Sequence, residues 1–544
     1  MLPCAAPRTA ARPGIPRFKQ APAAASDVIR GALGQPWPTR AATLARRNWL
    51  FSALLGAGLI LRLLAWIAYS PALLYVDTLK YLYGVYPGAD PLGYRVLLKA
   101  VVPAGGLGTV AFGQALLGLA VAVAMYAVLR RQGVTRWLAA VATAPVLLDA
   151  YQLQMEQTIM PDVWFDALIL AGLAVLLWQP GVPLRFAAGA GLILGSSATV
   201  KALGEVLILP AAVYLVAVWG GWRPALRRLA AFAVAFALPV LGYCGVSYVH
   251  SGHFWLARAQ SHSGRLAAAA DCAALRAPAA VRALCPTPRQ QAQGPDWLEH
   301  SGASPLEVNP IPPGARRATL IAKFDAAVER QQPARVVASI ARDAVRLFAV
   351  TRTPTAGVVP LSRWQFQTTY PTYPPWITVG RGHVIVVGLQ RRAFGMFRPH
   401  ALTPSYGGPA RVIKPVAAFL RGYQQRGGYT PGPLFLAFAV AGLAGSALAL
   451  LRRARAARSR GLALGCLLFT VTAVTVLLVP DVLEFSWRYQ LPALVTLPPA
   501  GVLGISAAAA YLRTRRECRT ERLVAASDVT WIPGPPKGSA AKTA

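Results

Sequence analysis

Long apolar runs separated by polar connections dominate this sequence. A helix that crosses a bilayer needs about 20 consecutive apolar residues, and several of the runs reach that length. The pattern therefore predicts an all-α polytopic membrane protein with roughly ten transmembrane helices. The expected spans cover residues 49–69, 107–129, 137–148, 163–178, 186–200, 203–219, 229–248, 433–451, 462–479 and 491–511.

The polar segments divide the chain into five parts. Between the seventh and eighth spans the apolar pattern stops, and residues 251–430 are expected to form an exported region of mixed helical and irregular structure. It separates an N-terminal transmembrane module, residues 46–250, from a C-terminal one, residues 431–512. Both ends of the chain bury too little apolar surface to fold. We expect a disordered basic cytoplasmic arm over residues 1–45 and a disordered cytoplasmic tail over residues 513–544.

The net positive charge of the chain is interpreted differently once the expected spans are taken into account. Hydrophobic residues make up 55% of the 544 positions, and the formal net charge is +35. In a soluble protein this charge would suggest nucleic acid. Here arginines crowd short loops beside apolar helices, as at Arg46, Arg130 and Arg227, and such loops face the cytoplasm. We therefore expect a multi-pass cell-membrane protein with both termini cytoplasmic, the Asp77 loop outside and no nucleic-acid partner.

Carboxylates gather at the outer ends of the expected spans, whereas the inner loops are almost purely basic. This sidedness predicts one polar site just outside the membrane. Simpler roles remain open, because an Asp can cap a helix and long cations can reach lipid headgroups. Within the first span, Arg62 either faces the protein interior or snorkels. The outer clusters are Asp77 with Asp90, Arg95 and Lys99; Glu156 with Asp162; Lys201 with Glu205; and Glu484 with Arg488.

The cysteines and histidines add one expectation. Cys272 and Cys285 bracket a short segment of the exported region, where a disulfide contributing about 3 kcal/mol can form; the alternative is two unpaired buried cysteines. No CxxC pair occurs among the six cysteines. His250, His253 and His262 have a spacing that suits a metal, but no carboxylate pattern accompanies them, so no metal site is predicted.

Four ordered stretches resemble the GT-C superfamily of polyprenyl-phosphate-sugar glycosyltransferases, which includes protein O-mannosyltransferases and lipid A aminoarabinose transferases. The resemblance extends from about Trp49 to Tyr511. In several members the first outer loop has adjacent acidic residues, whereas here Asp77 is followed by Thr78. The four stretches are YVDTLKYLYG with GYRVLLKAV, MEQTIMPDVWF, GLILGSSATVKALGEVLILPA and SWRYQLPALVTLP.

The resemblance implies an inverting sugar transfer from a lipid-phosphate donor to an acceptor hydroxyl on the outer face. Its catalytic carboxylates would be Asp77, as general base, with Glu156 and Asp162. Arg95, Lys201 and Arg488 would bind the donor phosphate, because a departing lipid phosphate needs cations. No cofactor is expected, and a divalent metal stays open. The implied partners are the polyprenyl-phosphate sugar, membrane lipids and an acceptor glycan, lipid or protein.

Two other classes of function compete with the transferase. A lipid or polysaccharide transporter or flippase would show internal repeats and charges along a mid-membrane pathway. The sequence has no clear repeat and one deeply placed charge, Arg62. A non-catalytic cell-envelope assembly protein would use its polar loops only as surface. The ordered clusters favour the transferase.

Overall fold

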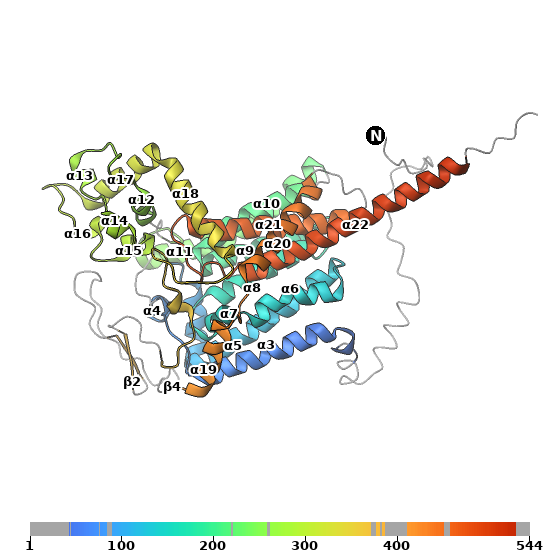
Figure 1. Ribbon diagram of the computed structural model, residues 1–544, viewed down its shortest axis with the longest axis horizontal. Coiled ribbons are helices and arrows are strands. Elements are labelled where there is room, and N and C mark those ends of the chain that lie inside the picture. The colour runs from blue at the N-terminus through green and yellow to red at the C-terminus, as the bar shows by residue number, and fades with distance from the viewer. Residues whose placement is uncertain are drawn as a thin grey trace, which may run out of the picture.

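The computed structural model is a bundle of apolar helices with a smaller helical region at one end (Figure 1). The bundle helices run side by side along its longest axis. The structure describes residues 43, 45–75, 77–83, 90–218, 221–257, 262–370, 377–380, 383–386, 411–450 and 457–528. The expected arm over residues 1–45 lies almost wholly outside these residues.

Each of the ten predicted apolar segments falls on a helix of the bundle. The segment 203–219 is divided between a 3-10 turn, η1, and a following helix. The elements are α3 (Trp49–Ala68), α5 (Gly93–Arg131), α6 (Arg136–Leu148), α8 (Asp162–Leu177), α9 (Leu184–Val200), η1 (Ala202–Leu207), α10 (Ile208–Ala217), α11 (Trp222–Ser251), α20 (Gly432–Leu450), α21 (Ala457–Asp481) and α22 (Ala493–Asp528).

Six helices among the described residues are long and apolar enough to cross a membrane: α3, α5, α11, α20, α21 and α22. The helices α6, α9 and η1 with α10 are apolar but shorter. Large apolar side chains on the bundle also face outward, such as Ile60 at 59% exposure and Val234 at 64%. A surface of this kind needs lipid around it. The protein is therefore a multi-pass membrane protein built from helices.

Helix α5 is longer than its predicted span because two helical runs join at a bend. Gly106 has a φ of +71°, a left-handed conformation that suits glycine, and Pro103 lies just before it. The span predicted over residues 107–129 starts directly after this bend. Residues 93–105 form a separate run that leads out of the first polar loop and carries Arg95.

The described residues between 251 and 430, which we call the large connection, lie at one end of the bundle. Two of its helices are separated at Gln332, and Pro333 starts the second. The elements are α12 (Ser263–Ala269), α13 (Ala279–Arg282), α14 (Pro288–Gln291), α15 (Pro295–His300), α16 (Pro305–Val308), α17 (Arg317–Gln331), α18 (Pro333–Ala344), η2 (Val345–Phe348), η3 (Leu361–Trp364), β2 (Ile377–Gly380), β3 (His383–Val386), β4 (Arg411–Val412) and α19 (Lys414–Gln425).

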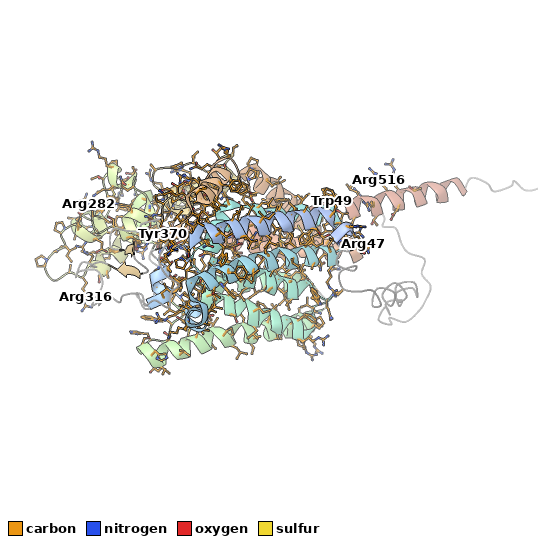
Figure 2. The ribbon with its side chains drawn as sticks, turned by 90° about the horizontal axis from the view of Figure 1, so that it is seen from below. Arg47, Trp49, Arg282, Arg316, Tyr370 and Arg516 are labelled. Carbon is orange, nitrogen blue, oxygen red and sulfur yellow. A yellow bond between two sulfur atoms is a disulfide. The ribbon has the colours of Figure 1, made fainter. Side chains whose placement is uncertain are left out.

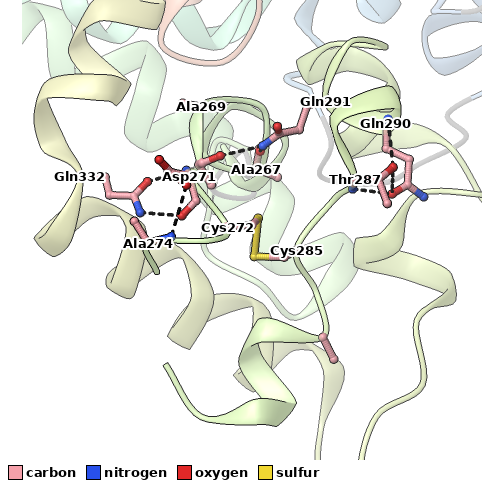
Figure 3. Close-up of a disulfide and its surroundings, with 12 residues drawn as sticks. Ala267, Ala269, Asp271, Cys272, Ala274, Cys285, Thr287, Gln290, Gln291 and Gln332 are labelled. Carbon is pink, nitrogen blue, oxygen red and sulfur yellow. Dashed lines mark hydrogen bonds between the residues drawn. A yellow bond between two sulfur atoms is a disulfide. The ribbon is translucent and has the colours of Figure 1, made fainter. Parts of the chain in front are cut away.

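The first part of the large connection has its own small core. Leu298, Phe324 and Val328 are fully buried in it. A disulfide joins Cys272 and Cys285, whose Cα atoms lie 5.8 Å apart (Figure 3). Nearby, the Gln332 side chain accepts from the backbone N–H of Asp271 and donates to its carbonyl. These contacts tie the disulfide loop to the start of α18.

The later part of the large connection returns to the first bundle helix. A short antiparallel pair forms between β1 (Tyr69–Ser70) and β4. Helix α19 packs on α3 and α7 (Ala150–Gln157). This arrangement covers the end of α3, directly before the loop that carries Asp77.

The end of the bundle opposite the large connection carries the basic residues near both termini. Arg47, Trp49 and Arg516 lie at that end in Figure 2, whereas Arg282, Arg316 and Tyr370 lie toward the other. Helix α22 continues to Asp528. Residues 513–528 of the expected tail are thus helical, and residues 529–544 lie outside the described part of the chain.

Candidate active site

The loop after α3 is held in place by the segment that precedes α8. The Thr78 hydroxyl accepts from the Tyr75 backbone N–H at 2.9 Å and donates to the Ile159 carbonyl at 3.0 Å. Helix α4 (Thr78–Tyr83) begins there. Asp77 is therefore presented at the start of a short helix anchored on the bundle, at the end that carries the large connection.

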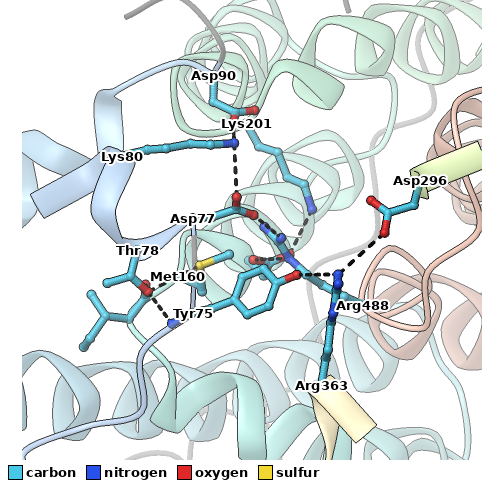
Figure 4. Close-up of polar contacts among 12 residues, drawn as sticks. Tyr75, Asp77, Thr78, Lys80, Asp90, Met160, Lys201, Asp296, Arg363 and Arg488 are labelled. Carbon is cyan, nitrogen blue, oxygen red and sulfur yellow. Dashed lines mark hydrogen bonds and ion pairs between the residues drawn. The ribbon is translucent and has the colours of Figure 1, made fainter. Parts of the chain in front are cut away.

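Arg488 joins this loop to α8 (Figure 4). Its Nη1 lies 2.7 Å from Asp77 Oδ2, and its Nε lies 3.1 Å from Asp162 Oδ1. The Arg488 side chain is 6% exposed and that of Asp162 is 4% exposed. One buried guanidinium thus bridges two carboxylates that are far apart in the sequence.

Two lysines extend the bridge at its ends. Lys80 Nζ lies 3.1 Å from Asp77 Oδ1 and 2.8 Å from Asp90 Oδ2. Lys201 Nζ lies 2.9 Å from Asp162 Oδ1. The result is a continuous set of three carboxylates and three cations, which we call the charge network: Asp90, Lys80, Asp77, Arg488, Asp162 and Lys201.

The charges keep Asp77 ionised although it is largely enclosed. Burial by itself would raise the pKa of Asp77, but Lys80 and Arg488 outweigh it and hold this pKa well below its usual range. Burial, and next the Asp77 charge, raise the pKa of the nearby Tyr75 hydroxyl to about 12. At neutral pH the loop therefore presents a carboxylate that can accept a proton beside a neutral phenol.

Aromatic rings surround the cations of the network. Arg488 lies over the rings of Trp364 and Tyr489, at 5.7 Å and 5.5 Å from their centroids. Lys201 lies 5.3 Å from the Tyr489 ring centroid. Ring faces attract cations and exclude water, which strengthens the electrostatic interactions of the site.

The large connection reaches Tyr75, beside the charge network, through Arg363. Its Nη1 donates to the Tyr75 hydroxyl at 3.2 Å and lies 3.6 Å from Asp296 Oδ2 in α15. Beyond Asp296, burial and this neighbouring carboxylate raise the pKa of Glu484 to about 8. The site thus contains side chains from the first loop, α8, the turn after α9, the segment before α22 and the large connection.

The structure brings together Asp77, Asp90, Asp162, Lys201 and Arg488 from the predicted clusters. Other predicted residues lie apart from the network. Glu205 and Lys99 are exposed. Arg95 is half-buried, and among the described residues its Nη1 has no hydrogen-bond partner.

Glu156 pairs with Arg62, away from the charge network. Arg62 Nη2 lies 2.7 Å from Glu156 Oε1, and both side chains are 2% exposed. Arg62 also donates to the Val146 and Leu147 carbonyls of α6, at 3.0 Å each. A Cβ at Gly118 would clash with the Glu156 carboxylate. This pair is a closed contact between α3, α6 and α7, so Arg62 faces the protein interior.

Sequence reasoning gave no role to Tyr75, Asp296 or Arg363. The sequence around them gave little indication of a functional role, because aromatic and charged residues are common in any polar region. The three histidines weighed as metal ligands are not gathered: His253 stacks on Trp255, and His262 Nε2 lies 2.8 Å from Glu329 Oε1.

Comparison with known proteins identifies no family. No protein-family model and no curated protein matches the chain. One similar solved structure is the S. cerevisiae protein O-mannosyltransferase Pmt1–Pmt2 complex bound to the sugar donor, with 17% identity and a TM-score of 0.30. The match covers 38% of this chain and 34% of that one. A likeness this weak assigns neither family nor activity.

Proposed function

We propose that the protein is a glycosyltransferase that moves a sugar from a polyprenyl-phosphate donor to an acceptor hydroxyl. The observation that carries the proposal is the Arg488 bridge between Asp77 and Asp162, at the end of a membrane-spanning bundle. A base and phosphate-binding cations side by side at a bundle end suit a substrate with a lipid tail and a polar, reactive head.

Asp77 is the general base in this proposal. The acceptor oxygen attacks the anomeric carbon, its proton passes to an Asp77 carboxylate oxygen, and the bond from that carbon to the phosphate oxygen breaks. Attack opposite the leaving phosphate inverts the configuration. The low pKa of Asp77 keeps it ionised at neutral pH, and a substrate phosphate that draws Arg488 away would make it more basic. Its 20% exposed side chain is the most accessible carboxylate on the Arg488 bridge.

The leaving phosphate needs positive charge near its oxygens. Among the described residues, Nη2 of Arg488 takes part in no hydrogen bond, because Nε and Nη1 make the contacts with Asp162 and Asp77. Lys201 has 13% of its side chain exposed. A phosphate that shares Arg488 would loosen its contact with Asp77 Oδ2 and free that oxygen for the proton. Arg95 is the third proposed phosphate ligand.

Asp162 and Glu156 take different parts. Asp162 accepts from both Arg488 and Lys201 and orients the two cations. Glu156 supports the bundle through Arg62. Because the Arg62–Glu156 pair is packed against Gly118 and backbone carbonyls, it provides no opening for a transport pathway. Transport therefore remains the weaker alternative, and a non-catalytic assembly role leaves the charge network unexplained.

The orientation expected from the basic loops places the charge network outside the cytoplasmic membrane and both termini inside. Single cysteines introduced into a cysteine-free variant at Gly302 and at Arg515 test it. The first should react with an impermeant thiol reagent in intact cells and the second only after lysis. The reverse labelling pattern would show that the charge network does not lie outside the cytoplasmic membrane.

The decisive experiment follows the donor. Purified protein in liposomes is incubated with a panel of radiolabelled polyprenyl-phosphate sugars and an extract of envelope acceptors, and loss of label from the lipid is measured. Asp77→Asn should abolish the loss, whereas Asp90→Asn should retain most of it. Movement of intact lipid between leaflets without consumption would favour a flippase. Folded protein that neither consumes nor moves any donor would leave the transferase proposal wrong.

A further inference from the structure

A second group of titratable side chains lies beside the charge network, on the other side of Arg363. Asp296 and His300 are four residues apart on α15, so both project from one face of that helix. Glu484 comes from the segment between α21 and α22. One ligand atom of each residue lies within 4.8 Å of the other two. The group therefore joins the large connection to the membrane bundle.

The spread of these atoms suits one shared ion. Zinc lies about 2.0–2.2 Å from nitrogen and oxygen ligands, so two ligands of one ion are about 3.4 Å apart in tetrahedral geometry. Side-chain rotations alone can close a group no wider than 4.8 Å to this size.

The positions of the two carboxyl groups show why a cation fits there. Asp296 and Glu484 are both half-buried, and ligand oxygens of the two lie within 4.8 Å of each other. The positive group found beside Asp296 is Arg363, at 3.6 Å. A divalent cation between the two carboxylates would offset the repulsion of their neighbouring negative charges.

We propose that Asp296, His300 and Glu484 bind one divalent cation of the zinc or manganese type. An imidazole ligand beside carboxylates favours these ions over magnesium and calcium, which take oxygen ligands. Three protein ligands leave a coordination position for water or a substrate oxygen. The ion would fasten α15 to the segment that carries Arg488.

The chain offers a matched control for this site. His262 and Glu329 form another histidine–carboxylate pair in the large connection, with 40% and 52% of their side chains exposed. They were not found in a group of three ligands among the described residues. Loss of this pair should leave the proposed site intact, although it removes the same residue types from the same region.

Metal content and unfolding test the proposal without an activity assay. The full chain, freed of any affinity tag, is stripped with a chelator in detergent, incubated with Zn²⁺, Mn²⁺ or Mg²⁺, and desalted before metal is measured by mass spectrometry. We expect about one Zn²⁺ or Mn²⁺ per chain and a higher unfolding temperature, because the ion binds the folded state. His300→Ala and Glu484→Gln should lose both effects, and His262→Ala should retain them.

Two results would overturn the site. One is folded wild-type protein that binds no Zn²⁺ or Mn²⁺ after stripping. The other is a Glu484→Gln or His300→Ala variant with the metal content of the wild type. His300 is exposed, so its replacement leaves the fold intact, and a single symmetric peak in size-exclusion chromatography verifies this for each variant. Neither result depends on whether the protein is a glycosyltransferase.

Discussion

The charge network and the Arg62–Glu156 pair both place an arginine against a carboxylate, yet their surroundings differ. The network alternates six charged groups, and its Asp77 and Lys80 side chains are each 20% exposed. The Arg62–Glu156 pair is sealed, with both side chains 2% exposed and backbone carbonyls around the guanidinium. A ligand can compete for partners in the first arrangement, whereas the second can only support the fold.

The largest expected effect separates the two regions by activity. Asp77→Asn keeps the shape of the side chain but removes the proposed base, so turnover should fall about 10²-fold to 10⁴-fold. Asn also caps helices well, so a helix-capping role predicts nearly normal turnover. The measurement is sugar transfer from labelled donor, with Asp90→Asn as control. Equal losses of turnover in Asp77→Asn and Asp90→Asn would mean that Asp77 is not the general base.

Disrupting the sealed Arg62–Glu156 pair should instead lower the stability of the fold. Glu156→Gln removes a charge and leaves Arg62 buried without its counter-ion, which should cost about 3–5 kcal/mol. Thermal unfolding in detergent measures this as a lower unfolding temperature. Donor affinity of the protein that remains folded should not change. A selective loss of donor binding would place Glu156 in the site after all.

Cations of the network should act on donor binding. Lys201→Met should raise the KM for donor about 10-fold to 100-fold, because hydrogen bonds to charged groups contribute about 1.5–3 kcal/mol. Lys414→Met on α19 removes an exposed lysine elsewhere and is the matched control. An unchanged KM for Lys201→Met would move phosphate recognition to Arg95 or Arg488.

A tighter comparison uses two glycines of α5. Gly118→Ala places a Cβ against the Glu156 carboxylate, and such overpacking typically costs about 1–3 kcal/mol. Gly113→Ala meets nothing within 4 Å and should be neutral or slightly stabilising. The unfolding temperatures of the two variants measure this difference in stability. If both behave alike, the pair is not packed as tightly as described.

The smallest effect concerns pH. Lys80 lowers the pKa of Asp77, so Lys80→Met should raise this pKa and move the acid limb of the kcat profile to higher pH. The sign follows because Asp77 must be ionised to accept a proton. Lys99→Met, which removes an exposed lysine, should leave the limb in place. A limb that stays unchanged in Lys80→Met would exclude Asp77 as the titrating base.

The helical segments could be predicted from the sequence because they depend on local composition. Apolar runs form helices wherever lipid surrounds them, since their backbone groups must bond internally. The bends and lengths were less predictable: Gly106 bends α5 between two helical runs, and η1 shortens the helix that follows it. Those details depend on which neighbours each helix meets.

For the candidate site, the sequence by itself determined that carboxylates and cations gather at one end of the spans. Only the tertiary structure decided their partners. Arg488 meets Asp77 across 411 positions and Asp162 across 326, and such pairings have no local signal. Glu156 and Asp162 are six residues apart, yet one faces Arg62 and the other Arg488. The physical reason is that helix packing, which is set by the whole bundle, determines which charge each carboxylate meets.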